Sequence, residues 1–392
     1  MSAPPAVTGV DVLIAGAGPA GMSTALHLCR ADPSWARRIL VVDKAIFPRP
    51  KLCGGGVTQP GADILTGLGL EFDSVHITID EVHFVLGEVA YVLHGAPAFR
   101  VVRRDEFDHW LVQQGEKQGV EVRQGEAIAG VVAQPDGIEV QTERGAYRAR
   151  VLVAADGSNG AVRRSLHWDD GGRKARLLEV LTPEAGDHPA FAQGRAVFDF
   201  TPLRRGLQGY YWDFPSLVGG QPFMNRGVYD SRAVAGGPRL DLKNVLAEAL
   251  ARRNLHLPEY ALKGHPLHWF DSAAVLSRPH VLLAGDAAGA DPLLGEGISF
   301  ALAYGKVAAA AILTAFQQDD FSFDDYTQRI GNDPILRQLR GRSQVATLLY
   351  RLSGRPGLAQ SAWTLAPLLL RLASWLRPAY FPIATPRLTR LA

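Results

Sequence analysis

The pattern of hydrophobic and polar residues predicts a mixed α/β protein that begins with a strand, a helix and a second strand. Residues 10–15 and 38–43 are short runs rich in valine, isoleucine and leucine, which are typical of buried strands. Residues 19–30 lie between them and have the composition of a helix. Two further strands are expected to end just before residues 156 and 285.

A different pattern, of β-branched and aromatic residues interrupted by glycine and proline turns, covers residues 76–99 and 176–272. It predicts an antiparallel sheet with one amphipathic helix at residues 242–254. We therefore expect residues 1–75, 100–175 and 273–319 to form the three parts of one α/β domain, residues 76–99 and 176–272 the two parts of a sheet domain, and residues 320–392 a helical C-terminal segment.

The turn after the first strand has the spacing G-x-G-x-x-G, at Gly16, Gly18 and Gly21, and Asp43 ends the second strand. Gly16 permits the tight turn, Gly18 lets the backbone approach a pyrophosphate, and Gly21 lets the helix pack close to the strand. The helix N-terminus attracts phosphate charge, and the carboxylate accepts hydrogen bonds from a ribose. This order predicts a dinucleotide site without deciding between NAD and FAD.

Composition narrows the class of protein. The 392 residues are 47% hydrophobic and 20% charged, which is typical of a globular protein, and the net charge of +2 does not favour nucleic-acid binding. Two cysteines are too few for a disulfide framework, so a reducing compartment is expected. The N-terminus lacks the pattern of a signal peptide, and nothing in the sequence indicates a metal site. We expect a cytoplasmic protein.

Two later segments favour FAD over NAD. "VAADG" ends at Asp156-Gly157, and "LLAGDAAG" contains Gly285-Asp286 ahead of "GEGI". Together with an R-x-x-F-D pattern at Arg104, these motifs resemble the FAD-dependent oxidoreductases of the para-hydroxybenzoate hydroxylase type. The resemblance implies an α/β fold in which a Rossmann-like FAD-binding domain of the GR2 type carries an inserted antiparallel β-sheet substrate domain. Gly160 departs from the usual pattern, because a serine is common there.

The resemblance also implies residue roles. Asp286 would hydrogen-bond the ribityl chain of FAD, and Arg104 would lie near the flavin or its phosphates; the alternative for Arg104 is a solvated side chain at a helix start. The residues expected to bind FAD, from the glycine fingerprint and the resemblance together, are Gly16, Gly18, Gly21, Asp43, Lys44, Lys51, Gly54, Gly55, Gly56, Arg104, Asp156, Gly157, Gly285, Asp286, Gly295, Gly297 and Ile298.

Within this superfamily, "KLCGGG" at residues 51–56 matches the K-x-C-G-G-G pattern of the geranylgeranyl reductase branch. "YYWDFP" adds Tyr210, Trp212, Phe214 and Pro215 in the Y-x-W-x-F-P spacing of the same branch. The resemblance implies that Cys53, Tyr210 and Trp212 are catalytic and that Phe214 and Pro215 contact the substrate. Halogenases of the superfamily usually have W-x-W-x-I-P instead. A G-x-G usually follows in the reductase branch, but here Gly227 is followed by Tyr229.

The residue types suit this interpretation. Three consecutive glycines let a flat ring lie against bare main chain, and the Cys53 thiol could donate or relay a proton in an apolar pocket. The alternative for Cys53, and the expectation for Cys29, is a small buried hydrophobic residue. Because side chains alternate along a strand, Tyr210, Trp212 and Phe214 are expected to share one face as a flat aromatic wall.

Three functions remain open on the sequence. The first is an FAD-dependent reductase of isolated C=C bonds in an isoprenoid or prenyl lipid, with hydride from flavin N5. The second is an FAD-dependent monooxygenase, a hydroxylase or halogenase of an aromatic or peptidyl substrate. The third is a flavin-binding accessory protein without turnover. NAD(P)H or a ferredoxin would supply electrons, because no second dinucleotide fingerprint is present. The sequence does not determine the oligomeric state.

The C-terminal segment is basic, aromatic and apolar, with Pro367 and Arg371 interrupting its most hydrophobic stretch. It lacks the uninterrupted apolar run of a spanning helix, and two interpretations remain. It could contact a membrane surface peripherally and help to deliver a lipid substrate, or it could cap the core as a helix pair. The residues behind these interpretations are Arg351, Arg355, Arg371, Arg377, Arg387, Arg390, Trp363, Trp375 and Tyr380.

Overall fold

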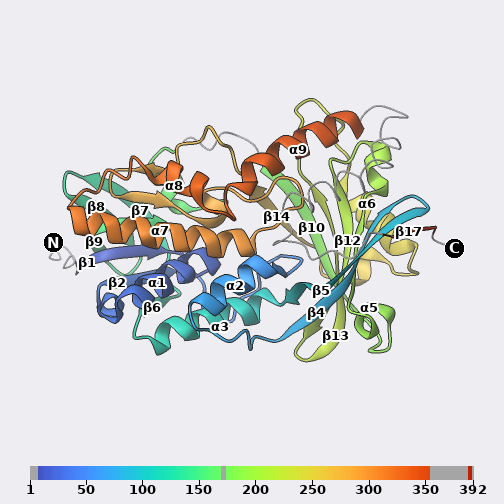
Figure 1. The fold of residues 1–392 in the computed structure, drawn as a ribbon, viewed down its shortest axis with the longest axis horizontal. Helices are drawn as coiled ribbons and strands as arrows, with labels where there is room; N and C mark the ends of the chain where they lie inside the picture. The colour runs from blue at the N-terminus through green and yellow to red at the C-terminus, as the bar shows by residue number, and fades with distance from the viewer. Residues whose placement is uncertain (1–7, 169–173, 354–386, 391–392) are drawn as a thin grey trace.

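The computed structural model describes residues 8–168, 174–353 and 387–390, which form two β-sheets at opposite ends of an elongated molecule (Figure 1). The first sheet, with α1 (Pro19–Ala31) and α7 (Ile298–Gln318) packed against it, is the predicted α/β part. The second sheet forms the other end. Helix α9 (Gln338–Ser353) extends from the helices of the first part toward the second sheet (Figure 1).

The first sheet has eight strands in the described residues, in the order β15-β16-β9-β1-β2-β6, with the β7–β8 hairpin joined to β9. The central pairs β1–β2, β1–β9, β2–β6 and β9–β16 are parallel, and their buried stretches are apolar: residues 12–15, 39–42, 151–154 and 281–283. The strands are β1 Thr8–Ala15, β2 Ile39–Asp43, β6 Glu121–Gln124, β7 Ile128–Gln134, β8 Gly137–Thr142, β9 Ala146–Ala154, β15 Ser277–Arg278 and β16 Val281–Leu283.

The close packing of α1 on β1 explains two of the predicted glycines. Gly16 has φ +104°, a conformation that L side chains rarely adopt, and a Cβ on Gly21 would lie 1.9 Å from the carbonyl oxygen of Gly16. Helix α7 crosses α1 in the same core. It is long and apolar enough to span a membrane, but 78% of its apolar window is buried inside the protein, as expected of a core helix.

The second sheet has nine strands in the described residues, in the order β14-β10-β13-β12-β11-β4-β5-β17, with β3 paired to β5. It is antiparallel as predicted, except that β4 and β11 pair in parallel. Its strands are β3 Gly56–Thr58, β4 His76–Leu86, β5 Val89–Val102, β10 Lys174–Pro183, β11 Arg195–Asp199, β12 Gly209–Val218, β13 Gln221–Asp230, β14 Lys263–His268 and β17 Arg387–Arg390.

Shorter helices fill the connections between the strands. The amphipathic helix expected at residues 242–254 is α6 (Leu242–Ala251), which ends three residues earlier and packs its apolar side on β10 and β13. The remaining helices are α2 Gln59–Gly67, α3 Arg104–Lys117, α4 Ala161–Ser165, α5 Pro189–Ala192 and α8 Tyr326–Asn332, with 3-10 turns η1 Pro33–Arg37, η2 Thr201–Arg205, η3 Leu257–Glu259 and η4 Gly285–Ala287.

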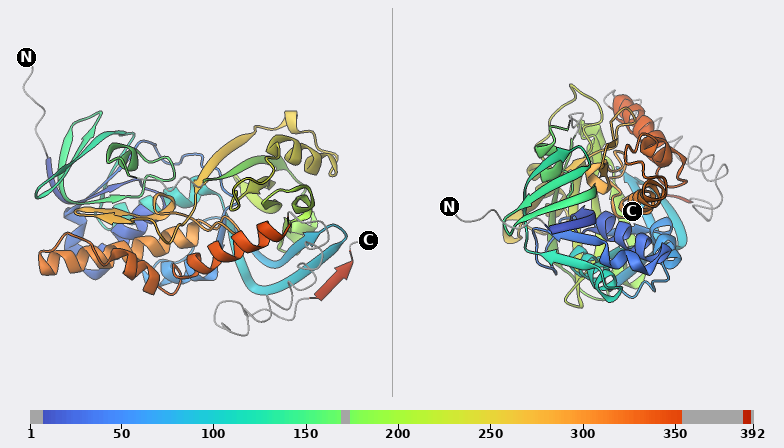
Figure 2. Two further views of the ribbon diagram at one scale, coloured as in Figure 1. Left: turned by 90° about the horizontal axis from the view of Figure 1, so that it is seen from above. Right: turned by 90° about the vertical axis from the view of Figure 1, so that its left-hand side faces the viewer.

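The C-terminal segment is helical at α8 and α9, as predicted, but residues 387–390 form a strand. This strand, β17, extends the second sheet by pairing antiparallel with β5, next to the β4–β5 hairpin (Figure 2). Arg351 lies on α9, and Arg387 and Arg390 lie in β17. The other residues behind the membrane prediction lie outside the described residues: Arg355, Trp363, Arg371, Trp375, Arg377 and Tyr380.

Candidate functional site

A cavity of about 1010 Å³ lies where the two sheets meet. One part is lined by loops of the first sheet, including Gly16, Gly18 and Asp43, and by the loop that precedes α7. The other part is lined by the second sheet, and we call it the apolar arm. The side chains that define the apolar arm are Val82, Phe84, Leu93, Phe99, Leu177, Phe198, Tyr210, Trp212 and Phe214.

The predicted fingerprint residues surround the first part of the cavity. The Asp43 carboxylate accepts hydrogen bonds from the backbone N–H groups of Ala17 and Ala45, each at 2.8 Å. A Cβ on Gly18 would meet only Arg49 Nη2, at 3.9 Å, so the space beside this backbone is open. Gly21 does not line the cavity; it packs α1 against β1, the role that the fingerprint predicts for it.

Asp156 is a half-buried acidic residue in the wall of the cavity. Its Oδ2 accepts a hydrogen bond from the Val162 N–H at 3.0 Å, whereas its Oδ1 has no partner among the described residues. Burial raises the pKa of this carboxyl group. A Cβ on Gly160 would lie 2.1 Å from Asp156 Oδ1. The glycine at position 160, where a serine is common, therefore makes room for this carboxylate.

Arg104 is buried in the cavity wall, so the alternative of a solvated arginine is wrong. Its guanidinium donates two hydrogen bonds to the fully buried Asp108, at 2.7 and 2.8 Å, and Arg49 pairs with the same carboxylate at 3.0 Å. Burial alone would lower the pKa of Arg104, but the charge of Asp108 raises it overall. Arg104 therefore presents a permanent positive charge beside Asp286.

The cavity fits FAD. The N-termini of α1 and α7 both lie on it, through Gly18 and Gly297, and a helix N-terminus attracts phosphate or a negatively charged ring. The open space at Gly18 and the unpartnered oxygen of Asp156 are the features of a site built for a polar ligand. The predicted FAD residues that line the cavity are Gly16, Gly18, Asp43, Lys44, Lys51, Gly54, Gly55, Gly56, Arg104, Asp156, Gly157, Gly285, Asp286, Gly295, Gly297 and Ile298.

The triple glycine packs mainly against protein. Gly55 has φ +83°, and a Cβ there would lie 2.1 Å from the carbonyl oxygen of Val102. A Cβ on Gly54 would lie 3.0 Å from the ring of Phe214, whereas one on Gly56 would make only ordinary contact. All three glycines line the cavity, but close contacts within the protein already explain two of them. The expectation that a flat ring lies against this main chain stays a prediction.

Strand β12 brings Tyr210, Trp212 and Phe214 to the apolar arm, as alternation predicts, while Tyr211 packs against α6 on the opposite face. The three rings do not form a flat wall: Tyr210 and Trp212 are inclined by 63°. Pro215 follows Phe214 and does not line the cavity, so the structure does not bring it to the site.

Strand β13 shapes the same wall. A Cβ on Gly227 would lie 2.1 Å from Trp212, so this glycine makes room for the indole. Tyr229 fills the place of the missing second glycine; it is buried, and its hydroxyl donates to the carbonyl oxygen of Pro292 at 3.1 Å. Tyr229 therefore ties the second sheet to the loop before α7.

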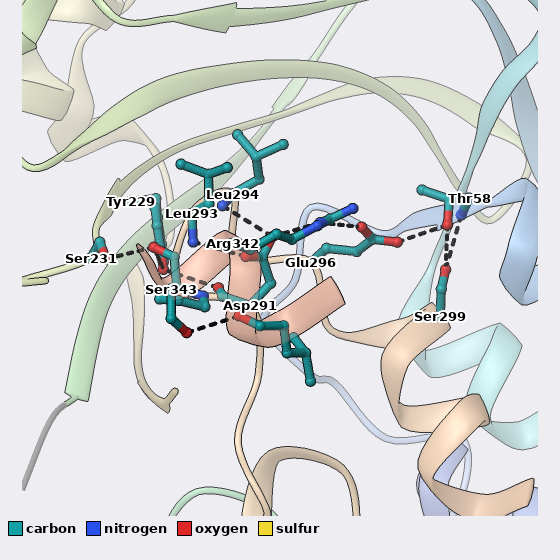
Figure 3. Close-up of polar contacts among 12 residues, drawn as sticks. Thr58, Tyr229, Ser231, Asp291, Leu293, Leu294, Glu296, Ser299, Arg342 and Ser343 are labelled. Atoms are coloured by element: carbon teal, nitrogen blue, oxygen red, sulfur yellow. Dashed lines mark hydrogen bonds and ion pairs between the residues drawn. The ribbon is translucent and has the colours of Figure 1, made fainter. Parts of the chain in front are cut away.

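That loop, residues 291–297, is held from three sides (Figure 3). Arg342 on α9 pairs with Asp291 and Glu296, both at 2.8 Å, and Glu296 accepts a hydrogen bond from the hydroxyl of Thr58 at 2.7 Å. The tyrosines Tyr210, Tyr229 and Tyr350 each donate to a carbonyl oxygen of the loop. Arg342 was not found from the sequence, because no motif relates α9 to the loop. Glu296 lies inside the "GEGI" motif, but only the other residues of that motif were expected to bind FAD.

Lys51 and Cys53 occupy the segment between the two parts of the cavity. Lys51 Nζ lies 2.7 Å from His265 Nε2, and the Cys53 sulfur accepts a hydrogen bond from the Gly55 N–H at 3.3 Å. The main chain of Cys53 is bonded on both sides, to Glu179 and Asn225 of the second sheet. Sequence reasoning missed His265, Glu179 and Asn225. Cys29 is buried in α1, as expected, and burial raises its pKa to about 11.

Comparison with known proteins agrees with this geometry. The sequence profile of a family described as an FAD binding domain matches residues 9–216, more than half of the chain. A menaquinone reductase of Mycolicibacterium smegmatis is 28% identical over 336 residues, covering 80% of this chain and 79% of that protein.

Two solved structures share the fold. A geranylgeranyl bacteriochlorophyll reductase-like protein from Thermoplasma acidophilum is 20% identical with a TM-score of 0.71, over 90% of this chain and 94% of that chain. The halogenase PltM is 16% identical with a TM-score of 0.67, over 89% and 78%. The chain therefore belongs to the FAD-binding domain family.

Proposed function

We propose that the protein reduces isolated C=C bonds of an isoprenoid or prenyl lipid. The observation that carries this proposal is the apolar arm, which is continuous with the FAD part of the cavity and meets it at Cys53 and Gly54. Its lining of aliphatic and aromatic side chains suits a hydrocarbon chain rather than a polar substrate. The menaquinone reductase among the relatives acts, by its name, on a prenylated quinone.

Bound FAD would supply a hydride equivalent at the meeting point of the two parts. Reduction of an alkene also needs one proton, delivered to the carbon that does not receive the hydride. Cys53 lies at this point, and its thiol is the proton donor in our proposal; the resulting thiolate regains a proton from water. Tyr210 and Trp212 shape the wall of the apolar arm and hold the alkene against the flavin site.

The test is anaerobic turnover. The FAD-loaded protein, reduced with dithionite, is incubated with menaquinone and with geranylgeranyl lipids, and the products are read by mass spectrometry. After any quinol has been reoxidised to the quinone in air, we expect a product heavier by two hydrogen atoms, and its loss in Cys53→Ala with the flavin spectrum kept. No mass change with any prenylated substrate would contradict the proposal, and full activity of Cys53→Ala would remove the role of the thiol.

The second candidate is a monooxygenase of an aromatic substrate. The aromatic lining at Phe84, Phe99 and Phe198 and the similarity to a halogenase fold support it. It makes the opposite prediction about oxygen: product would form only in air, with an oxygen or halogen atom added. NAD(P)H or a ferredoxin is the proposed electron donor in both cases, and the rate of flavin reduction by each compares them.

We further propose peripheral membrane contact through the C-terminal segment. Helix α9 has no acidic residue, and its exposed side chains include Arg340, Val345, Leu348 and Arg351. Such a basic and apolar face suits anionic lipid. Flotation with anionic liposomes, compared between the full chain and a chain that ends at residue 353, tests which part binds. Failure of both to float would contradict the proposal.

A further inference from the structure

The main chain of Cys53 is held by two side chains of the second sheet. Glu179 Oε2 accepts a hydrogen bond from the Cys53 N–H at 3.0 Å. Asn225 Nδ2 donates a hydrogen bond to the Cys53 carbonyl oxygen at 2.9 Å. Both backbone polar groups of a single residue are thus fixed by side chains that lie more than a hundred residues away in sequence.

A third side chain fixes the orientation of Asn225. Trp212 Nε1 donates to Asn225 Oδ1 at 2.8 Å, so the amide nitrogen is left to face Cys53. Glu179, Asn225 and Trp212 stand on the adjacent strands β10, β13 and β12. In this register Glu179 lies opposite Gly227, the residue that makes room for the Trp212 ring. One patch of a rigid sheet therefore determines where the thiol stands.

Glu179 is an unusual residue for a strand interior. Its side chain is almost fully buried, with only 2% of the residue exposed, and a buried carboxylate is costly unless it is hydrogen-bonded or paired. Arg103 and Lys263 are the nearby positive charges, and the described ion pairs within 4 Å do not include Glu179. An apolar residue would fill the same place without this cost. Unlike an apolar residue, Glu179 accepts a hydrogen bond from the Cys53 N–H, which indicates why a carboxylate stands here.

We propose that Glu179 and Asn225 are positioning residues that hold the Cys53 thiol in place at the junction of the FAD site and the apolar arm. The Cys53 sulfur already accepts from the Gly55 N–H, so its direction follows the main chain that the two side chains hold. The placement itself does not depend on the reaction. Only its benefit, delivery of the proton to one carbon of the alkene, rests on the proposed function.

Thiol alkylation tests the placement without turnover. The chain has two cysteines, and Cys29 is buried with a raised pKa, so iodoacetamide incorporation measured by intact mass reports on Cys53, with Cys53→Ser as the blank. In the FAD-loaded protein we expect Glu179→Ala and Asn225→Ala to alkylate roughly tenfold faster than the wild type, because one charge-assisted and one neutral hydrogen bond are lost. Rates within twofold of the wild type in both variants would overturn the proposal.

Two controls separate placement from stability. Asp213→Asn removes a buried carboxylate of the same sheet on the opposite face, where Asp213 pairs with Arg226, and it should leave the alkylation rate unchanged. Glu179→Gln keeps an oxygen acceptor for the Cys53 N–H, so it should alkylate more slowly than Glu179→Ala. Should Glu179→Ala fail to fold, Asn225→Ala and Glu179→Gln carry the test. Altered alkylation without prenyl-lipid turnover would support the placement and contradict the proposed function alone.

Discussion

Lys51 Nζ and His265 Nε2 lie 2.7 Å apart, and this contact joins the segment of residues 51–56 to strand β14. Burial and the charge of Lys51 lower the pKa of His265 to about 4, although Asp286 opposes the shift; Arg104 and Lys44 act in the same direction as Lys51. Burial also lowers the pKa of Lys51. His265 is thus the neutral acceptor for the lysine ammonium at physiological pH.

The first prediction concerns stability in acid. Because His265 has a lower pKa in the folded than in the unfolded protein, the unfolded chain takes up the proton first as the pH falls. The contribution of His265 to stability is therefore lost between pH ~6.5 and ~4, so the stability of the wild type should fall relative to that of His265→Gln over this range. Melting temperatures at several pH values measure this. Parallel curves for the two proteins would contradict the assignment.

The second prediction has the opposite sign. Burial raises the pKa of Glu179 to about 7, opposed by Arg103, Lys263 and the hydrogen bonds from Cys53 and Asn225. The folded protein therefore binds the proton more tightly, and the stabilisation that protonation gives is lost as the pH rises from ~4.5 to ~7. Glu179→Gln should remove that loss, on the order of 3 kcal/mol, because each pH unit is worth ~1.4 kcal/mol. Urea unfolding at pH 5 and pH 7.5 measures the difference.

The third prediction compares two neighbouring glycines. Alanine at Gly55 must adopt φ +83° and place its Cβ 2.1 Å from the Val102 carbonyl oxygen, so we expect a loss of more than ~2 kcal/mol. Alanine at Gly56 meets Phe99 at 3.7 Å and should change stability by less than ~1 kcal/mol. Urea unfolding of both variants tests this. Equal losses would show that the segment tolerates or rejects side chains for another reason.

The fourth prediction concerns the loop before α7. Arg342→Met leaves Asp291, which is fully buried, and Glu296 without their cation, and breaking such a pair costs ~3–5 kcal/mol. Because Gly295, Glu296 and Gly297 line the cavity, FAD should bind more weakly as well, as measured by flavin fluorescence. Arg340→Met, an exposed arginine of the same helix, is the control and should bind FAD normally.

Local patterns predicted much of the site, and long-range partners did not follow from them. The fingerprint glycines and the face of Tyr210 and Trp212 follow from short-range geometry, which the sequence carries directly. Lys51 and His265 are separated by 214 residues, so their contact depends on how the two sheets meet. Strand β17 was mistaken for helix because an edge strand of four residues has too little pattern to detect.

After Asp43, the last residue of β2, the chain leaves the first sheet. It joins the second sheet at β3, where Gly56 pairs with Val101. Cys53, just before this crossing, is consequently attached to the same scaffold as Trp212. If one sheet rotates relative to the other when ligands enter or leave, the Cys53 sulfur moves together with the apolar arm. Such a motion would leave the distance from the Cys53 sulfur to the lipid chain unchanged. It would change the distance from the sulfur to the nucleotide.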